Sequence, residues 1–120
     1  MEKNKEQDYV MFKELFNKIT REAGRISENN GWHEPGTDRS ITTLILLMHA
    51  ELSEAVEALR EGNPRSKKIP EYSSVEEELA DVIIRIMDAA VEFGYDISGA
   101  IIDKMIFNTT RPPRSGGKKF

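Results

Sequence analysis

The stretch LILLMHAELSEAVEAL, residues 44–59, is an apolar and helix-forming run that carries two glutamates, Glu51 and Glu54. A leucine at either position would stabilise a buried helix more, because burying a lone carboxylate costs several kcal/mol unless a positive group pairs with it. Either the two glutamates face water or they hold something positive. The rest of the sequence bears on this choice.

Composition limits the class of protein. A chain of 120 residues predicts a single domain, 1–120, and the absence of Cys excludes disulfides and thiolate metal sites. The charged first ten residues do not resemble a signal peptide, and the longest apolar stretch is too short to span a membrane. The net charge of −4 argues against binding a nucleic acid polymer. We therefore expect a cytoplasmic protein.

The charge is unevenly distributed along the chain. Residues 104–120 hold five of the 17 Lys and Arg side chains and no Asp or Glu, so the preceding residues are strongly acidic. A basic tail, 112–120, ends the chain. Such a tail is either a solvated end or a clamp for phosphate groups that faces metal-binding carboxylates.

Four segments have the spacing of apolar residues that is typical of helices. The first covers about 7–29, and the second covers about 40–61, where Gly62 and Pro64 stop it. The third begins after Ser73 or Ser74, with a glutamate three residues on as in a capping box, and ends at Gly94. The fourth covers about 96–110. The sequence predicts an all-α fold, a compact four-helix bundle.

The second segment is apolar on nearly every side around residues 41–48. A helix that is apolar all round is buried all round, and one small bundle can hardly enclose it. We therefore expect a partner chain of the same kind, in a dimer or a dimer of dimers. Helical spacing predicts that this segment buries a stripe consisting of Ile41, Ile45, Met48, Leu52, Val56 and Leu59.

Each of the two central helices offers a pair of carboxylates one turn apart. Glu51 and Glu54 are three residues apart, and so are Glu78 and Asp81. If the helices pack side by side, the four carboxylates converge and repel one another until a hard divalent cation neutralises them. Oxygen ligands favour Mg²⁺, Mn²⁺ or Ca²⁺ over zinc. The alternative is two solvated faces, with Arg85 paired to Asp81 and Arg60 paired to Glu57.

The two pairs, ELSE at 51–54 and ELAD at 78–81, resemble the ExxE…ExxD pattern of the MazG-type all-α nucleoside triphosphate pyrophosphohydrolases. The resemblance extends to KMIFNTTRP, where Lys104, Asn108 and Arg111 match the family's trailing Lys, Asn and Arg. It covers residues 32–120. It implies a Mg²⁺-dependent hydrolase, with Mn²⁺ as a substitute, that cleaves a nucleoside or deoxynucleoside triphosphate to the monophosphate and pyrophosphate, as in nucleotide-pool house-cleaning.

The resemblance also implies residue roles. Glu51, Glu54, Glu78 and Asp81 are the expected metal ligands, and Glu51 and Glu54 the expected catalytic residues, with Glu54 as the base that takes the proton of a water molecule. Lys104 and Arg111 are expected to neutralise the β- and γ-phosphates, with Asn108 donating to a phosphate or sugar oxygen. Active sites partly walled by a neighbouring chain are expected as well.

Some alternatives stay open at this stage. Trp32, the only tryptophan, either stacks on a base or plugs the end of the bundle. Phosphoribosyl-ATP pyrophosphohydrolases and dUTP or dCTP hydrolases share the carboxylate pattern, so the substrate is not decided. A helical module that binds nucleotide or metal without turnover, and serves in interactions, is the alternative outside the enzymes.

Overall fold

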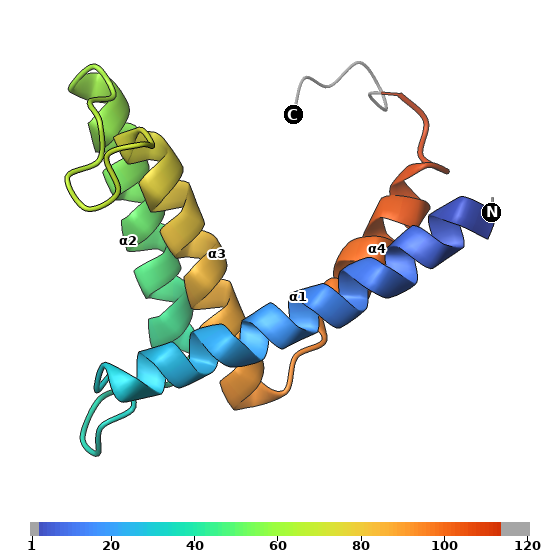
Figure 1. Ribbon diagram of the computed structural model, residues 1–120, viewed down its shortest axis with the longest axis horizontal. Helices are drawn as coiled ribbons and strands as arrows, with labels where there is room; N and C mark the ends of the chain where they lie inside the picture. Colours follow the sequence, from blue (N-terminus) through green and yellow to red (C-terminus); the bar gives the residue numbers. More distant parts are fainter. Residues whose placement is uncertain (1–2, 114–120) are drawn as a thin grey trace. The chain divides into compact units, whose positions relative to one another are not determined.

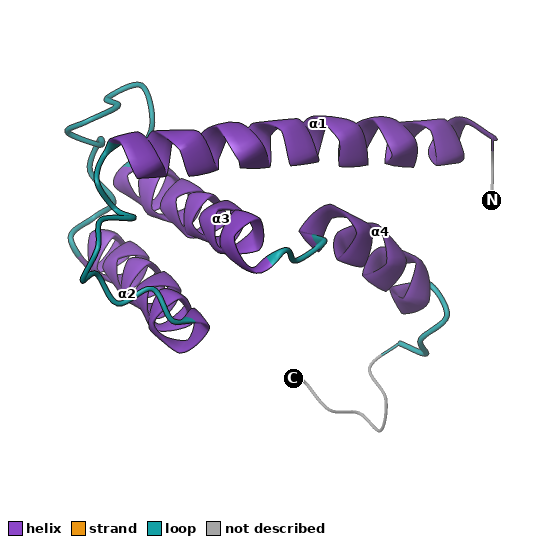
Figure 2. Ribbon diagram, turned by 90° about the horizontal axis from the view of Figure 1, so that it is seen from below, coloured by secondary structure: helices purple, strands orange, loops and turns teal. Residues whose placement is uncertain are grey.

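The computed structural model describes residues 3–113, and every regular element in that range is a helix (Figure 1). The helices are α1 (Lys3–Asn29), α2 (Ile41–Arg60), α3 (Ser74–Phe93) and α4 (Ile97–Asn108). No strand lies between residues 3 and 113 (Figure 2), which confirms the all-α prediction. Within the same residues no helix has both the length and the hydropathy needed to cross a membrane. All but the first two residues of the predicted basic tail, 112–120, lie outside the described residues.

Helix ends follow the local signals in the sequence. The Ser40 and Asp96 side chains accept hydrogen bonds from the first turns of α2 and α4. Ser73 and Glu76 form a capping box at the start of α3, with both reciprocal hydrogen bonds present. Gly94 ends α3 in the left-handed conformation at φ 69°, which glycine adopts without steric cost. All four predicted helices are therefore confirmed within a few residues.

The chain divides into two units by its internal contacts. One unit holds the first part of α1, to Asn17, together with the residues from Asp96 onward, and the other holds residues 18–95. In the first unit, the buried Ser98 hydroxyl donates to Asn17 Oδ1 at 2.9 Å and so ties α4 to α1. The arrangement of all four helices as one bundle stays a prediction.

In the unit of residues 18–95, α2 and α3 lie side by side (Figures 1 and 2). Both helices bury small side chains in this unit, among them Ala55 and Ala58 on α2 and Ala89 on α3. The second half of α1 also approaches α3, at Gly24. A Cβ added at Gly24 would stand 3.2 Å from a methyl group of Val91. The faces that are buried are thus lined by small residues.

The predicted apolar stripe of α2 is wrong. Leu44, Ala55 and Ala58 are the buried apolar residues of this helix, whereas the predicted stripe leaves Val56 at 52% and Leu59 at 59% exposed. Buried and predicted faces differ by roughly a quarter turn at 100° per residue. The periodicity of a helix that is apolar nearly all round does not identify one side, and close packing selects the side with alanines. Glu51 lies at the centre of that buried side, one turn before Ala55.

Candidate metal centre

Carboxylates line the contact between α2 and α3. The side chain of Glu51, on the alanine-lined face of α2, is only 13% exposed. Glu78 and Asp81 on α3 are half-buried, while Glu54 at the edge of the contact is exposed. The alanines permit a close approach of the two helices, and this approach brings acidic side chains of both helices together.

The carboxylates form two overlapping groups of three. In one group Glu51, Glu54 and Glu78 place one oxygen each within 4.8 Å of one another, and in the other Glu77, Glu78 and Asp81 do the same. Glu78 belongs to both. The predicted convergence of the two motifs is therefore present, although within residues 3–113 the four expected ligands do not fall into a single group. Oxygens this close repel strongly when all the groups are ionised.

Glu78 is the carboxylate of the cluster whose ionised form is the least favourable. Its Oε2 atom is buried and has no hydrogen-bond partner among the described residues. Burial, and then the proximity of Glu51 and Glu54, raises the pKa of Glu78 to about 8. At neutral pH the folded chain thus keeps a proton on Glu78, which can be donated to a neighbouring carboxylate. Burial and the charges of Glu51 and Glu77 also raise the pKa of Asp81.

The pKa of Glu51 is shifted in the opposite direction. Burial alone raises its pKa, but hydrogen bonding with Glu78, Arg85 and Glu54 outweighs burial, and the pKa of Glu51 falls below its ordinary value. Arg85 Nε donates to Glu51 Oε1 at 2.9 Å. The sequence alternative had paired Arg85 with Asp81, and the structure pairs it with Glu51 across the two helices. The expected pair of Arg60 and Glu57 is present at 3.7 Å, on the exposed side of α2.

The cluster fits a hard divalent cation. Its ligand atoms are carboxylate oxygens, which Mg²⁺ and Mn²⁺ prefer, and no Cys or His belongs to either group. An ion bound there would give the buried Glu78 oxygen the partner that it lacks. It would also replace the Glu78 proton, because metal ligands must be deprotonated. The donor chemistry fits a metal at Glu51, Glu54 and Glu78, and the full set with Asp81 stays a prediction.

Glu77 is a member of the cluster that the sequence interpretation missed. The sequence offers Glu76 or Glu77 as the partner in a capping box and assigns only Glu78 of this run to the metal. In the structure Glu76 makes the cap, whereas Glu77 accepts a short hydrogen bond from the Ser66 hydroxyl and lies 3.9 Å from Lys68 Nζ. Its position four residues before Asp81, on the same side of the helix, was the signal available in the sequence.

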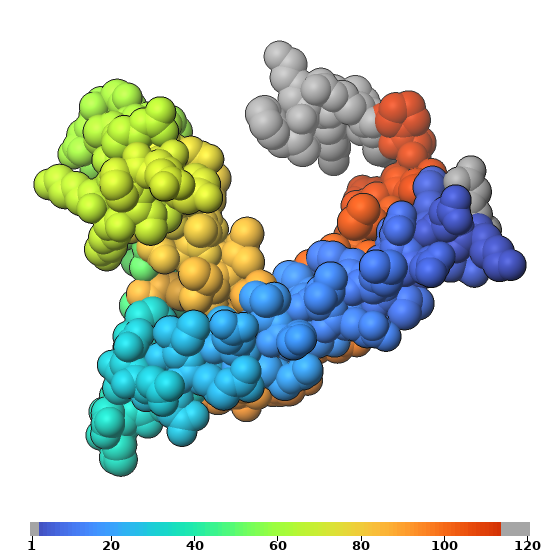
Figure 3. All heavy atoms as spheres, in the orientation of Figure 1, coloured from blue at the N-terminus to red at the C-terminus, as the bar shows by residue number. Residues whose placement is uncertain are grey.

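A cleft of about 480 Å³ opens beside the carboxylates. Glu54, Glu77 and Glu78 line it from the two helices, and the loop between α2 and α3 supplies the opposite charges of Arg65, Lys67 and Lys68. This loop lies at one end of the α2–α3 pair (Figure 3). Acidic and basic walls therefore share one cleft.

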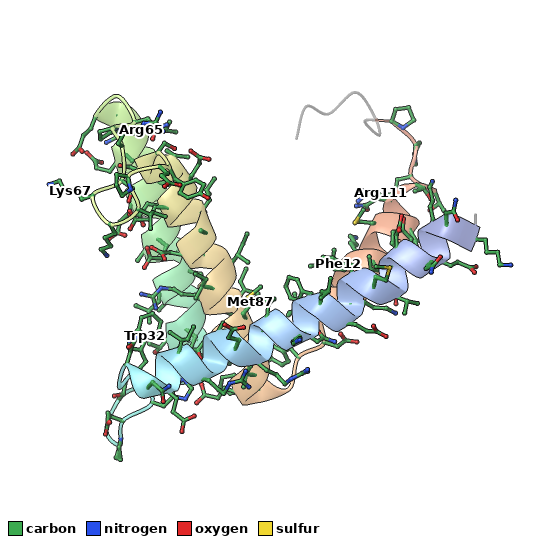
Figure 4. The ribbon with its side chains drawn as sticks, viewed as in Figure 1. Phe12, Trp32, Arg65, Lys67, Met87 and Arg111 are labelled. Carbon is green, nitrogen blue, oxygen red and sulfur yellow. The ribbon has the colours of Figure 1, made fainter. Side chains whose placement is uncertain are left out.

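Trp32 lies at the other end of the same helix pair (Figure 4). Its ring is covered by the Arg85 guanidinium, whose carbon is 5.2 Å from the ring centroid. Trp32 is still 39% exposed and lines a largely apolar pocket of about 260 Å³ together with Ile26, Ile84 and Met87. An exposed indole on a pocket wall agrees better with stacking on a ring than with plugging the end of a bundle.

The loop that carries Trp32 is anchored to α3. Asp88, which is 3% exposed, accepts from His33 Nε2 at 3.0 Å and from Arg39 Nη2 at 2.7 Å. Arg39 also bonds both oxygens of Glu92 at 3.1 Å. The buried carboxylate is thereby satisfied from two directions, as a buried charge requires. These contacts position Trp32 against Arg85.

Lys104, Asn108 and Arg111 belong to the other unit. Lys104 and Asn108 are exposed on α4, where Lys104 Nζ lies 4.8 Å from the centroid of the Phe107 ring. Arg111 follows the helix and its backbone N–H donates to Asn108 at 3.2 Å. Lys104 and Asn108 thus lie on the same helix, and Arg111 lies just after its end. Their meeting with the carboxylates of the unit 18–95 stays a prediction.

Comparison of the chain with protein-family models, with curated proteins and with solved structures finds no match.

The first prediction concerns Glu78→Gln. A raised pKa means that the folded chain holds a proton that the unfolded chain, with the ordinary value of 4.5, has released. Without metal, the stability of the wild type should therefore fall as pH rises between these two pKa values, and the variant should lack this loss. We expect the variant to melt at the same temperature as wild type at about pH 4 and at a higher temperature at about pH 9.

The response to Mg²⁺ completes this test. At a hundred times its dissociation constant, the ion should stabilise wild type by about 2.7 kcal/mol, and Glu78→Gln by much less. Glu14→Gln is the matched control, since Glu14 is exposed on α1, does not line the cleft and belongs to neither group. Melting curves that shift equally in all three proteins would exclude a metal site at Glu78.

Proposed function

We propose that the protein is a Mg²⁺-dependent hydrolase that converts a nucleoside or deoxynucleoside triphosphate into the monophosphate and pyrophosphate. The observation that carries this proposal is the meeting of both carboxylate motifs at the α2–α3 contact, with a buried and unpartnered oxygen on Glu78. The resemblance of the motifs to the MazG-type pyrophosphohydrolases points to the same reaction.

The residues of the unit 18–95 supply most of the required chemistry. Glu51, Glu54, Glu78 and Asp81 would hold the metal, which when bound would supply positive charge to phosphate oxygens and lower the pKa of a water molecule. Glu54 is exposed to the cleft and takes the proton from the attacking water, while Glu51 is held by Arg85 and serves as a fixed ligand. The Trp32 indole receives the base in the adjoining apolar pocket.

Residues of the unit with α4 complete the proposed site. Lys104 and Arg111 neutralise phosphate oxygens, and Arg111 does so with a planar fork of donors. Asn108 follows Lys104 by one helical turn and donates to a phosphate or sugar oxygen. The part that these three residues play is taken from the resemblance of KMIFNTTRP to the family motif.

The second prediction is the product pattern. Incubation with the common NTPs and dNTPs in Mg²⁺ should release pyrophosphate and a monophosphate from at least one of them, because charge builds on phosphate oxygens next to the cluster. Separation of the products by ion-exchange chromatography provides the measurement. Release of orthophosphate and a diphosphate, or no turnover with any nucleotide, would reject the proposed reaction. Binding without turnover would favour the non-catalytic module instead.

The third prediction separates the basic residues from the fold. Lys104→Ala and Arg111→Ala should raise KM or lower kcat by about tenfold or more, since each loses a charge-assisted hydrogen bond to phosphate. The stabilisation by Mg²⁺ alone should stay unchanged in both variants. Lys5→Ala, a change of the same charge on α1, is the control. Loss of the Mg²⁺ response in either variant would assign these residues to the fold.

We also propose that the protein assembles as a homodimer or a dimer of dimers. The support is the exposure of large apolar side chains on α2, with Leu46 at 60%, Val56 at 52% and Leu59 at 59%. Large apolar side chains that are exposed together on one helix are typical of an interaction site. A second copy presents the same surface, so a two-fold axis can cover both.

The fourth prediction tests this assembly. Light scattering should give twice or four times the chain mass of 13.7 kDa. Leu46→Glu should shift the protein toward the single-chain mass, because a charge would be buried in the interface. Gln7→Glu, which adds the same charge at an exposed position of α1, should leave the mass unchanged. A wild-type protein with the mass of one chain at micromolar concentration would contradict the proposal.

A further inference from the structure

The loop between α2 and α3 is held in its conformation by hydrogen bonds. At its centre is Ser66, which is 2% exposed. The Ser66 hydroxyl accepts from the backbone N–H groups of Lys68 and Ile69 at 3.2 and 3.0 Å and donates to Glu77. The Ser66 backbone N–H donates to the Tyr72 carbonyl at 2.9 Å. One buried hydroxyl thus folds the loop and ties it to a carboxylate of the candidate metal centre.

Three cationic side chains surround this buried serine in the sequence RSKK, residues 65–68. Arg65 Nη1 makes one long hydrogen bond, 3.3 Å, to the Glu71 carbonyl, and Lys68 is 84% exposed. No ion pair of the described residues includes Lys67. All three line the cleft, which is also lined by the carboxylates of Glu54, Glu57, Glu61, Glu77 and Glu78. Most of their donors are therefore free to bind an anion in that cleft.

The order of the groups along the helix pair matches one kind of ligand. Trp32 and its apolar pocket lie at one end, and Arg65 and Lys67 lie at the other (Figure 4). The carboxylates lie between the two ends. Arg85, which covers Trp32, and Glu78 are seven residues apart on α3, about 10 Å along the axis. A nucleoside triphosphate has the same order, with an apolar ring, a region that binds a divalent ion, and terminal phosphates.

We infer that Arg65, Lys67 and Lys68 bind the two terminal phosphates of the substrate, those that leave as pyrophosphate. This inference deepens the proposed function and rests on it for the identity of the substrate. The positive loop would neutralise the anion while the carboxylates hold the metal, so that a complex of metal and pyrophosphate contacts both kinds of side chain in one cleft. Ser66 is a positioning residue, because it holds the cations at a fixed place relative to Glu77.

The test measures binding of pyrophosphate in the presence of Mg²⁺ by calorimetry, without any turnover. The double variant Lys67→Gln/Lys68→Gln should bind magnesium pyrophosphate about tenfold or more weakly than wild type, since two charge-assisted contacts are lost. Its affinity for Mg²⁺ alone should be equal to that of wild type or greater, because neighbouring positive charge has been removed. Added salt should weaken binding more in wild type than in the variant.

Two further variants separate position from charge. Lys18→Gln changes a lysine of α1 that does not line the cleft, and it should bind magnesium pyrophosphate as wild type does. Ser66→Ala keeps all three cations but removes the hydroxyl that ties the loop to Glu77. It should weaken binding of magnesium pyrophosphate by several-fold, whereas a role of the loop in net charge alone predicts no change.

Failure of this inference is distinguishable from failure of the proposed reaction. Equal binding of magnesium pyrophosphate by wild type and the double variant, or no binding by wild type, would overturn the phosphate assignment whatever the enzyme does. Loop-dependent binding in a protein that hydrolyses no nucleotide would uphold the assignment while rejecting the reaction.

Discussion

Two helices that contact each other through glutamates need a positive charge between them or a proton on one of the acids. In α2 and α3 both answers are present. Arg85 pairs with Glu51, and Glu78 keeps its proton because burial and its neighbours raise its pKa to about 8. Replacing these acids with apolar residues would remove the repulsion and gain apolar burial. The arrangement is therefore unfavourable for the stability of the fold alone, whereas a role in binding a cation would explain it.

The same contact explains why the unit exposes its large apolar side chains. Alanine and glycine faces bring the helix backbones together, as at Ala55, Ala89 and Gly24, and most of the larger apolar side chains, Leu44 excepted on α2, stay exposed. A carboxylate cluster requires this close approach, since its oxygens must lie within a few ångströms of one another. Bulky residues at the seam would hold the helices apart. A site built at a narrow seam thus displaces apolar area to the outer faces, where another copy can cover it.

Local signals in the sequence predicted the helices well and their buried faces poorly. A helix end depends on a few neighbouring residues, and Ser73 with Glu76, or Gly94, is sufficient to define it. Which side of α2 is buried depends on its contact with α3. The spacing of residues along α2 alone therefore does not show that Ala55 is buried and Val56 exposed. Pairing two helical motifs needed one assumption, that the helices are adjacent, and the convergence of Glu51 with Glu78 followed.

The residues that were missed share one property. Ser66, the loop cations and the hydrogen bond of Glu77 to Ser66 depend on a contact between a helix and a loop, which no periodic pattern records. Only the spacing of Glu77 to Asp81 is visible in the sequence. Lys104 and Arg111 were found by resemblance to a motif, which gives a residue a role without giving it a position. The loop cations have a position at the cleft without a motif. A triphosphate carries more negative charge than one divalent ion neutralises, so both sets of cations can act on the same ligand without redundancy.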